Sequence, residues 1–206
     1  MRTMCGRYTL TASNKPDLAA LKFDVPDRHN IAPQSDVLVE TRLDGFTMKP
    51  WSLSPPWAAA PMHLFNARLE TLDEKPSFKG SLRCVFLADG WYEWQRSANH
   101  KQPWYHHREG ELMRFAGVYH PSSGCAIVTT AAQPDIEHIH HRQPVLLTAQ
   151  TAAGWLASAP AAECLTDYPV AFHQVSSQVN SARTDSPELS LPIQENASIN
   201  PQGTLF

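Results

Sequence analysis

Prolines divide this chain into short pieces, and that division limits the folds it can adopt. The 206 residues include 17 prolines but only 9 glycines. Proline lacks a backbone N–H and is poorly tolerated inside helices and central strands, so it favours rigid turns. The apolar runs between these turns are short. We therefore expect many short strands and few long helices.

The strongest turn signal is Asp44-Gly45, which separates the apolar runs 37–43 and 46–53. An Asp-Gly pair between two such runs is typical of a β-hairpin. Other short runs, bounded by turn residues, predict further strands at 83–88, 91–95, 103–107, 114–119, 125–130 and 170–175.

Helices are predicted only for short segments. Ser13 and Pro16 offer an N-cap and a first-turn proline ahead of the spaced Leu18 and Leu21. Two more short helices are predicted near 134–138 and 151–157. The pattern indicates an α+β fold with a mostly antiparallel, curved or barrel-like sheet. We expect a single domain over residues 1–190 and an irregular tail over 191–206.

Composition places the chain among globular proteins, with 42% hydrophobic and 18% charged residues. The net charge of −3 does not indicate a strongly basic nucleic-acid binder, although 12 of the 17 Lys and Arg fall within residues 1–100. No apolar run is long enough to span a membrane, and no apolar leader follows the first residues. We expect a cytoplasmic protein with no membrane partner.

The four cysteines show no CxxC or zinc-finger spacing. Cys84, Cys125 and Cys164 lie in apolar or Ala-rich sequence and are expected to be reduced, buried thiols. Cys5, between Met4 and Gly6 near the chain start, does not fit that pattern. His138 and His140 are spaced by two residues without a second ligand pair, so we expect no metal and no cofactor.

Five clusters could carry chemistry, although each has an ordinary structural explanation by itself. Tryptophans usually pack in cores or turns, and a glutamate between aromatic residues commonly lies on the solvated face of a strand. Histidines in turns are mostly solvated. The clusters occupy residues 5–7, 51–57, 66–70, 89–94 and 138–144.

Taken together and in this order, the clusters resemble the SRAP family, the SOS-response-associated peptidases or abasic-site-processing proteins. The resemblance extends over about residues 4–190 and implies an SRAP-like fold. Its motifs are Cys5-Gly6-Arg7, Asn30–Pro33, Trp51–Trp57, Asn66–Glu70, Gly90–Trp94 and His140–Pro144.

The resemblance implies a protein that senses abasic sites in single-stranded DNA and shields them during the DNA damage response. In the family, the cysteine is the mature N-terminus and crosslinks to the ring-opened sugar aldehyde. The chemistry is sound, because an α-amine with a pKa of about 7.7–8.0 is partly neutral near pH 7 and can form a Schiff base. The thiol of the same residue then closes a five-membered thiazolidine, which an internal Cys5 could not form.

The resemblance also implies catalytic roles for Cys5, Asn66, Glu93 and His140. Asn66 would position the sugar or the amine. Glu93 would act as the acid–base carboxylate near the amine, and His140 would move protons at the sugar oxygen. The family is further credited with self-cleavage, the origin of its peptidase name, and a lyase activity on the DNA strand would be a side reaction.

DNA-binding roles follow for three arginines and two tryptophans. Arg7, Arg68 and Arg142 would contact backbone phosphates. Trp51 and Trp57, in a proline-stiffened loop, would stack on or wedge between bases. The expected partner is single-stranded DNA that contains an abasic site, bound by a monomer, and DNA-bound protein would be associated with the nucleoid.

The chain departs from the family pattern at two places. Family sequences usually begin Met-Cys, whereas here Met4 precedes Cys5. We favour translation from Met4 with methionine removal, and the alternative is cleavage of the Met4–Cys5 bond. His141 adds a second imidazole beside His140, to which we assign the proton transfer, with His138 as a less suitable substitute.

Three other functions remain open from the sequence. A Cys–His peptidase acting on other peptides would use Cys5 as thiolate and His140 as base. A non-covalent single-stranded DNA-binding module would need only the aromatic and arginine side chains. A globular protein with a small-molecule pocket is the third.

Overall fold

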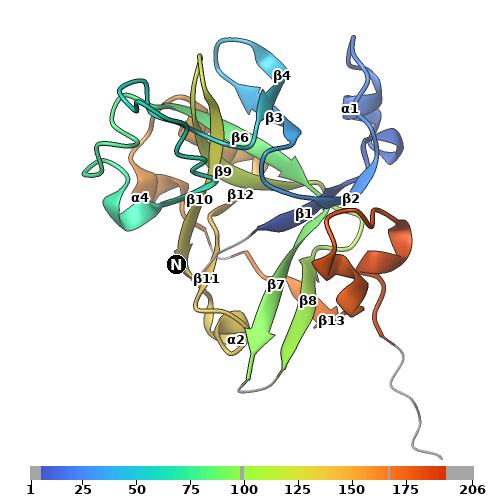
Figure 1. Cartoon of the computed structure of the whole chain (residues 1–206). Helices are drawn as coiled ribbons and strands as arrows, with labels where there is room; N and C mark the ends of the chain where they lie inside the picture. The colour runs from blue at the N-terminus through green and yellow to red at the C-terminus, as the bar shows by residue number, and fades with distance from the viewer. Residues whose placement is uncertain (1–5, 98–99, 167, 194–206) are drawn as a thin grey trace, which may run out of the picture.

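The computed structural model describes residues 6–97, 100–166 and 168–193, with the side chain of residue 17 left out. Two sheets form most of it, and short helices lie at their edges (Figure 1). The sheets divide as follows. The first contains β1 (Arg7–Leu10), β2 (Arg28–Ile31), β7 (Gly90–Arg96), β8 (Lys101–His107) and β13 (Ala171–Gln174), in the order β13-β8-β7-β1-β2.

The second sheet has eight strands, six of them in the order β11-β10-β9-β6-β3-β4. β12 pairs with β9, and β5 pairs with β10 in parallel. Its members are β3 (Asp36–Thr41), β4 (Gly45–Pro50), β5 (Asn66–Arg68), β6 (Leu82–Ala88), β9 (Met113–His120), β10 (Gly124–Ala131), β11 (Arg142–Pro144) and β12 (Leu146–Leu147).

Both sheets are mostly antiparallel, so the predicted α+β class is confirmed. Over the described residues neither sheet closes into a barrel, because each strand order runs from one edge strand to another. The hairpin predicted at Asp44-Gly45 is present as β3–β4, and Gly45 has a positive φ of 64° that suits glycine at this turn.

The helices are short. They are α1 (Pro16–Ala19), α2 (Pro134–Glu137), α3 (Ala149–Leu156) and α4 (Ala161–Cys164), with 3-10 turns η1 (Ala12–Asn14), η2 (Leu69–Thr71), η3 (Ser177–Asn180) and η4 (Pro187–Ser190). The helix expected after Ser13 ends at Ala19, and η4 lies at the end of the expected domain, just before the stretch expected to be irregular. No helix in the described part of the chain is both long and apolar enough to cross a membrane.

A cluster of large aromatic side chains fills the space between the two sheets. Tyr8 of β1 packs edge-on against Trp51, Phe86 and Phe115, at centroid distances of 5.3 to 6.4 Å. All four side chains are fully buried. Edge-to-face packing of this kind adds specificity to the apolar burial that stabilises the core. This cluster attaches β1, the strand that follows residues 5 and 6, to the second sheet.

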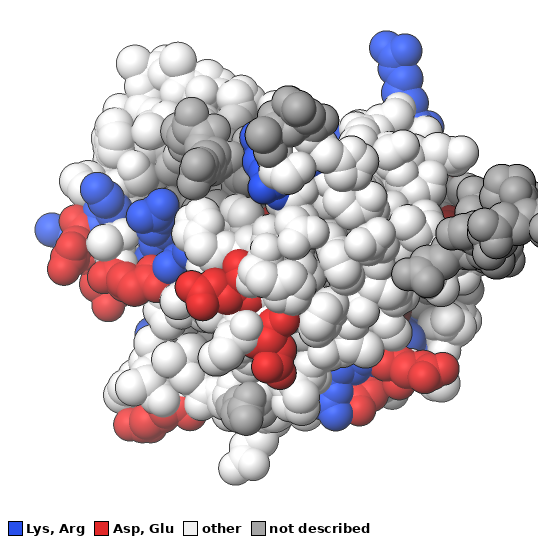
Figure 2. Space-filling model, turned by 90° about the horizontal axis from the view of Figure 1, so that it is seen from below, with Lys and Arg blue, Asp and Glu red and all other residues white. Residues whose placement is uncertain are grey.

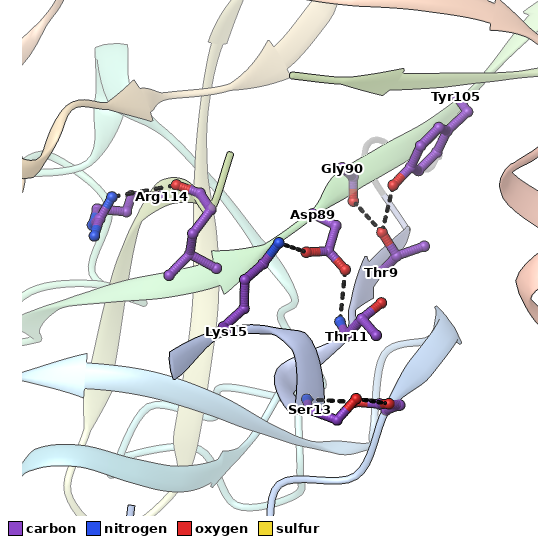
Figure 3. A network of polar contacts seen from close by, with 10 residues as sticks. Thr9, Thr11, Ser13, Lys15, Asp89, Gly90, Tyr105 and Arg114 are labelled. Carbon is purple, nitrogen blue, oxygen red and sulfur yellow. Dashed lines mark hydrogen bonds and ion pairs between the residues drawn. The ribbon is translucent and has the colours of Figure 1, made fainter. Parts of the chain in front are cut away.

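Polar contacts fix β1 against β7 in the first sheet. The Thr9 hydroxyl lies 2.7 Å from the Tyr105 hydroxyl, and the Asp89 carboxylate accepts a 2.6 Å hydrogen bond from the Thr11 amide (Figure 3). Lys15 pairs with the same carboxylate at 3.1 Å. Gly90 is required where the strands meet, since a Cβ there would lie 2.4 Å from the His106 carbonyl oxygen. The end of β1 is therefore held against the start of β7 and the neighbouring strand β8.

Candidate functional site

A cavity of about 370 Å³ opens beside the first residues of β1. Its lining comes from distant parts of the sequence, namely the start of β1, the segment after β2, both strands of the β7–β8 hairpin, the turn before β11 and η3. The lining residues are Gly6, Arg7, Ala32, Pro33, Glu93, Trp94, Arg96, Lys101, His140 and Asn180. Cys5 lies outside the described residues, and Gly6 is the residue that follows it.

Glu93 is the single carboxylate in this lining. It lies in the middle of β7, opposite Trp104 of β8, and only 3% of its surface is exposed. Its Oε2 atom is 3.9 Å from Nδ1 of His140. A buried carboxylate beside an imidazole provides two groups that can exchange or relay a proton within one cavity.

His140 follows α2, and the buried side chains of Ile136 and Ile139 anchor this turn. Its Nδ1 atom lies 3.2 Å from the Arg142 amide, which donates to it, and 3.1 Å from the Arg142 carbonyl oxygen. Burial lowers the pKa of His140 below the ordinary 6.5, and the neighbouring cations act in the same direction. The neutral imidazole, which can accept a proton, is therefore favoured near pH 7.

The structure distinguishes the three neighbouring histidines by position. His140 lines the cavity, whereas His141 is exposed and stacks at a tilt on it, with centroids 4.5 Å apart. His138 is exposed and packs edge-on against Trp104. Of these three imidazoles, only that of His140 lies beside Glu93.

Asn66 and Arg68 lie in the second sheet and are not among the residues that line the cavity. They belong to β5, where Asn66 is opposite Ile127 and Arg68 is opposite Thr129 of β10. Asn66 is half-buried, and Arg68 is exposed. The structure thus places Glu93 and His140 together, whereas Asn66 lies on the β5–β10 strand pair of the second sheet.

Two of the three predicted phosphate-binding arginines already have protein acceptors. Arg142 forms a fork with Glu70 at 2.6 and 2.8 Å, and it donates to the Thr129 carbonyl at 2.7 Å. The guanidinium of Arg142 holds the pKa of Glu70 below its usual value. Arg7 donates to the Asn30 side chain at 2.9 Å and to the Val179 carbonyl at 2.8 Å. Of the three, Arg68 is the one with an exposed side chain.

The two predicted base-stacking tryptophans have different environments. Trp51 is fully buried in the aromatic core, where its Nε1 donates to the Phe65 carbonyl at 2.8 Å. A side chain without exposed surface cannot stack on a base in this conformation, so Trp51 packs the core and does not present a face to DNA. Trp57 is 61% exposed, and its Nε1 donates to the Pro76 carbonyl at 3.3 Å.

A segment near the C-terminal end forms one wall of the cavity. We call residues 176–185 the C-terminal strap. The Asn30 side-chain amide is within 3.3 Å of the carbonyl oxygens of Val179, Ser181 and Thr184. Asn180 of the strap accepts a 2.7 Å hydrogen bond from the indole of Trp94. The strap was not expected to be part of the site, because these contacts are made with residues 86 to 154 positions away in the sequence.

Sequence reasoning also missed Arg96 and Lys101. They sit directly opposite each other at the turn end of the β7–β8 hairpin, where the connection between the two strands begins and ends. The signal was available, because strands predicted at 91–95 and 103–107 with a short connection place both ends of that connection together.

The surface charge around the site is local and not continuous. In the view from below, Lys and Arg side chains form small groups separated by wide uncharged areas, and acidic groups lie between them (Figure 2). Across the described ranges, no group of three or more His, Cys, Asp and Glu side chains is arranged to hold a metal ion. The arrangement offers a buried acid–base pair with a few cations beside it.

Comparisons with known proteins identify the family to which the chain belongs. The family model described as SOS response associated peptidase (SRAP) matches residues 4–182. The abasic site processing protein YoqW of Bacillus subtilis is 34% identical over 221 residues, which cover 90% of this chain and 98% of the relative. The corresponding protein YedK of Escherichia coli is 29% identical and is covered in full. A solved protein of Bacteroides thetaiotaomicron, at 22% identity, shares the fold with a TM-score of 0.68 over 81% of this chain and 85% of its own.

Proposed function

Because the chain belongs to the SRAP family, we propose that it processes abasic sites in DNA, as its curated relatives are named for doing. We propose further that it captures the site in single-stranded DNA through a covalent bond to Cys5. The observation that carries this proposal is the Glu93–His140 pair, 3.9 Å apart, in a cavity whose lining begins at Gly6. Consecutive Cα atoms are about 3.8 Å apart, so Cys5 is bonded directly to a residue of the cavity wall.

The reaction needs two bonds from one residue. The neutral α-amine of Cys5 attacks the aldehyde carbon of the ring-opened abasic sugar, and loss of one water gives the imine. The Cys5 sulfur then adds to the imine carbon, and the thiol proton ends on the nitrogen. The product is a five-membered thiazolidine, and its net balance is aldehyde plus cysteine minus one water.

Glu93 and His140 provide the proton transfers. The sugar must open by moving a proton to its ring oxygen, and the amine must lose a proton before it attacks. His140 is favoured in its neutral form by burial and accepts or returns the proton at the sugar oxygen. Glu93 would act as the acid–base carboxylate that assists imine formation. Asn66, on β5, would orient the sugar from the second sheet.

The DNA strand would approach the cavity along surfaces of both sheets. Arg68 is exposed on β5 and can contact a phosphate directly, and Arg142 lies beside it with its fork on Glu70. Trp57, exposed on the loop before β5, has a free face for stacking on a base, which is typical of single-strand recognition. Arg7 supports the strap and acts at the site through it.

The proposed reaction requires that Cys5 carry a free α-amine. Either removal of Met4 or cleavage of the Met4–Cys5 bond by the protein itself would achieve it, and the second route is the autoproteolytic activity we propose. Strand cleavage through the imine is the accompanying lyase reaction. We propose that the protein acts as a monomer in the cytoplasm and joins the nucleoid when it is bound to damaged DNA.

Trapping experiments with cysteine variants test the covalent mechanism. Wild-type protein incubated with a single-stranded oligonucleotide containing one abasic site should give a product that survives a denaturing gel without reductant. Cys5→Ser keeps the amine but cannot close the thiazolidine, so its product should persist only after reduction by borohydride. The control Cys164→Ala removes a thiol outside the cavity and should behave as wild type.

Each alternative predicts a different outcome. If Cys5→Ser and Cys5→Ala bind DNA normally and wild type gives no product stable to denaturation, the protein is a non-covalent binding module. If wild type cleaves added peptides with a Cys5 thiolate and ignores the aldehyde, it is a peptidase acting on other chains.

A further inference from the structure

Arg96 and Lys101 form a pair of cations at the rim of the cavity that the proposed mechanism does not use. Arg96 ends β7, Lys101 begins β8, and the register places them directly opposite each other. Both line the cavity together with Glu93 and His140, and both side chains are exposed. Two positive charges therefore meet where the cavity opens.

Several partly buried cations of this molecule form ion pairs with a nearby carboxylate. Lys15, Lys49 and Arg108 each lie within 3.6 Å of a carboxylate. In the part of the chain that the structure describes, neither Arg96 nor Lys101 has an ion pair. Lys101 instead lies over the indole of Trp94, with Nζ 4.5 Å from the ring centroid.

Like charges directly opposite each other on neighbouring strands destabilise a sheet. Burial lowers the pKa of Lys101, and repulsion from Arg96 and Arg7 adds to this effect. The carboxylate of Glu93 acts in the opposite direction, but burial and the two arginines outweigh it. An anion placed between Arg96 and Lys101 would relieve this repulsion. The two side chains together therefore favour the binding of an anion.

We propose that Arg96 and Lys101 bind one backbone phosphate of the DNA strand, next to the abasic sugar. This inference rests on the proposed function. An arginine offers two parallel N–H donors to phosphate oxygens, and a lysine adds a compact positive charge. The buried Glu93 repels an anion from the deeper part of the cavity, so the phosphate stays at the rim and the uncharged sugar lies toward Glu93 and His140.

The position of Arg96 and Lys101 defines a path for the DNA strand across the site. Arg96 and Lys101 belong to the first sheet, whereas Arg68 and Arg142 belong to the second. His140 lies between, two residues before Arg142, and faces Glu93 of the first sheet. A DNA strand with one phosphate bound on each sheet would bring the abasic sugar between these phosphates to Glu93 and His140.

A coupling experiment tests the assignment. The ligand is a fluorescent single-stranded oligonucleotide with a tetrahydrofuran abasic analogue, which has no aldehyde and binds without reacting. Single phosphates near the analogue are replaced in turn by neutral methylphosphonate. Dissociation constants are measured by anisotropy at several salt concentrations for wild type and for the double variant Arg96→Gln/Lys101→Gln.

One methylphosphonate position should weaken wild-type binding by about tenfold, and the double variant should show the same loss with the unmodified strand. The two changes should not add, because they remove the same contact. The salt slope should fall by about 0.7 for the lost phosphate contact. Arg96→Lys/Lys101→Arg keeps both charges and should retain the wild-type slope.

The matched control is Arg42→Gln/Lys22→Gln, which removes two exposed cations at the β3–β4 turn and near α1, far from the cavity (Figure 1). It should keep the response to every methylphosphonate. If the Arg96/Lys101 variant keeps wild-type affinity, slope and methylphosphonate response while wild type still captures a reactive abasic site, this assignment is overturned and the proposed function stands. If wild type neither binds the analogue nor captures the reactive site, both fall.

Discussion

At the scale of single residues, the proposed chemistry depends on a buried glutamate of the first sheet and a half-buried histidine on the turn before β11. Glu93 is placed by β7 and His140 by the turn after α2, and their facing atoms are 3.9 Å apart. The strand that carries Glu93 was predicted from its aromatic and polar pattern. Its proximity to His140 could not be predicted from local pattern, because it arises from packing between segments 47 residues apart.

Replacement of Glu93 by glutamine tests the acid–base role directly. Glu93→Gln keeps the size of the side chain but removes its charge and its proton exchange, so crosslinking to an abasic oligonucleotide should slow by about 10²-fold. Binding of the unreactive analogue should persist, which separates chemistry from recognition. Glu109→Gln, an exposed surface change, is the control and should leave the rate unchanged. An unaltered rate in Glu93→Gln would remove this residue from the mechanism.

A second residue-scale prediction concerns His106, a buried histidine with no role in the proposed reaction. Its ring stacks on Trp91 at 4.7 Å, and burial lowers its pKa from 6.5 to about 3. Between these two values the unfolded chain binds a proton that the folded chain does not. Stability should therefore fall as the pH falls below about 6.5, by at most about 1.4 kcal/mol per pH unit.

Urea unfolding at pH 7 and pH 5 measures this effect. His106→Phe preserves the stacking and cannot titrate, so it should lose less stability than wild type between the two pH values. His100→Gln, which changes an exposed histidine, should match wild type. If His106→Phe and wild type lose the same stability between pH 7 and pH 5, groups other than His106 cause the loss.

At the scale of elements, short strands and tight turns determine where the site residues sit. The Asp-Gly turn predicted the β3–β4 hairpin, and short apolar runs bounded by turn residues predicted the positions of β6 to β10. The very short strands β5, β11 and β12 have too few residues to show a period of two. The C-terminal strap is invisible to pattern analysis because Asn30 holds it by its backbone carbonyl groups.

The strap gives an element-scale prediction. Asn30 is 1% exposed, accepts from Arg7 and donates toward three strap carbonyls. Asn30→Ala leaves these buried partners unsatisfied and should lower the free energy of unfolding by about 1–3 kcal/mol. It should also slow crosslinking, since Asn180 of the strap lines the cavity. Urea unfolding and a crosslinking time course check both effects, with the exposed Asn14→Ala as control. Wild-type stability in Asn30→Ala would show that the strap is held by other contacts.

At the scale of the whole molecule, the site lies where the two sheets meet, and neither sheet holds all of it. The first sheet contributes Glu93 and the cations of the β7–β8 hairpin, and His140 lies beside Glu93 on the turn that leads into β11 of the second sheet. This division explains why a chain with a net charge of −3 can be proposed to bind DNA. A few cations at one cavity are enough for such binding, and the face seen in Figure 2 carries charges of both signs.

The family motifs predicted much of this site, but not the state of each side chain. Glu93 and His140 lie together as the resemblance implied, whereas Trp51 is fully buried and Arg142 is already paired with Glu70. Burial and ion pairing depend on segments that are remote in the sequence. A motif identifies which residue types recur, while the packing of the two sheets decides which of them face the cavity.

The most direct test of the central claim is denaturing intact-mass spectrometry. Protein beginning at Cys5 would be prepared and weighed before and after incubation with a single-stranded oligonucleotide that carries one abasic site. We predict a mass gain equal to the oligonucleotide less one water, present for wild type and absent for Cys5→Ala. A chain that begins at Cys5, binds the oligonucleotide and shows no gain in mass would contradict covalent capture.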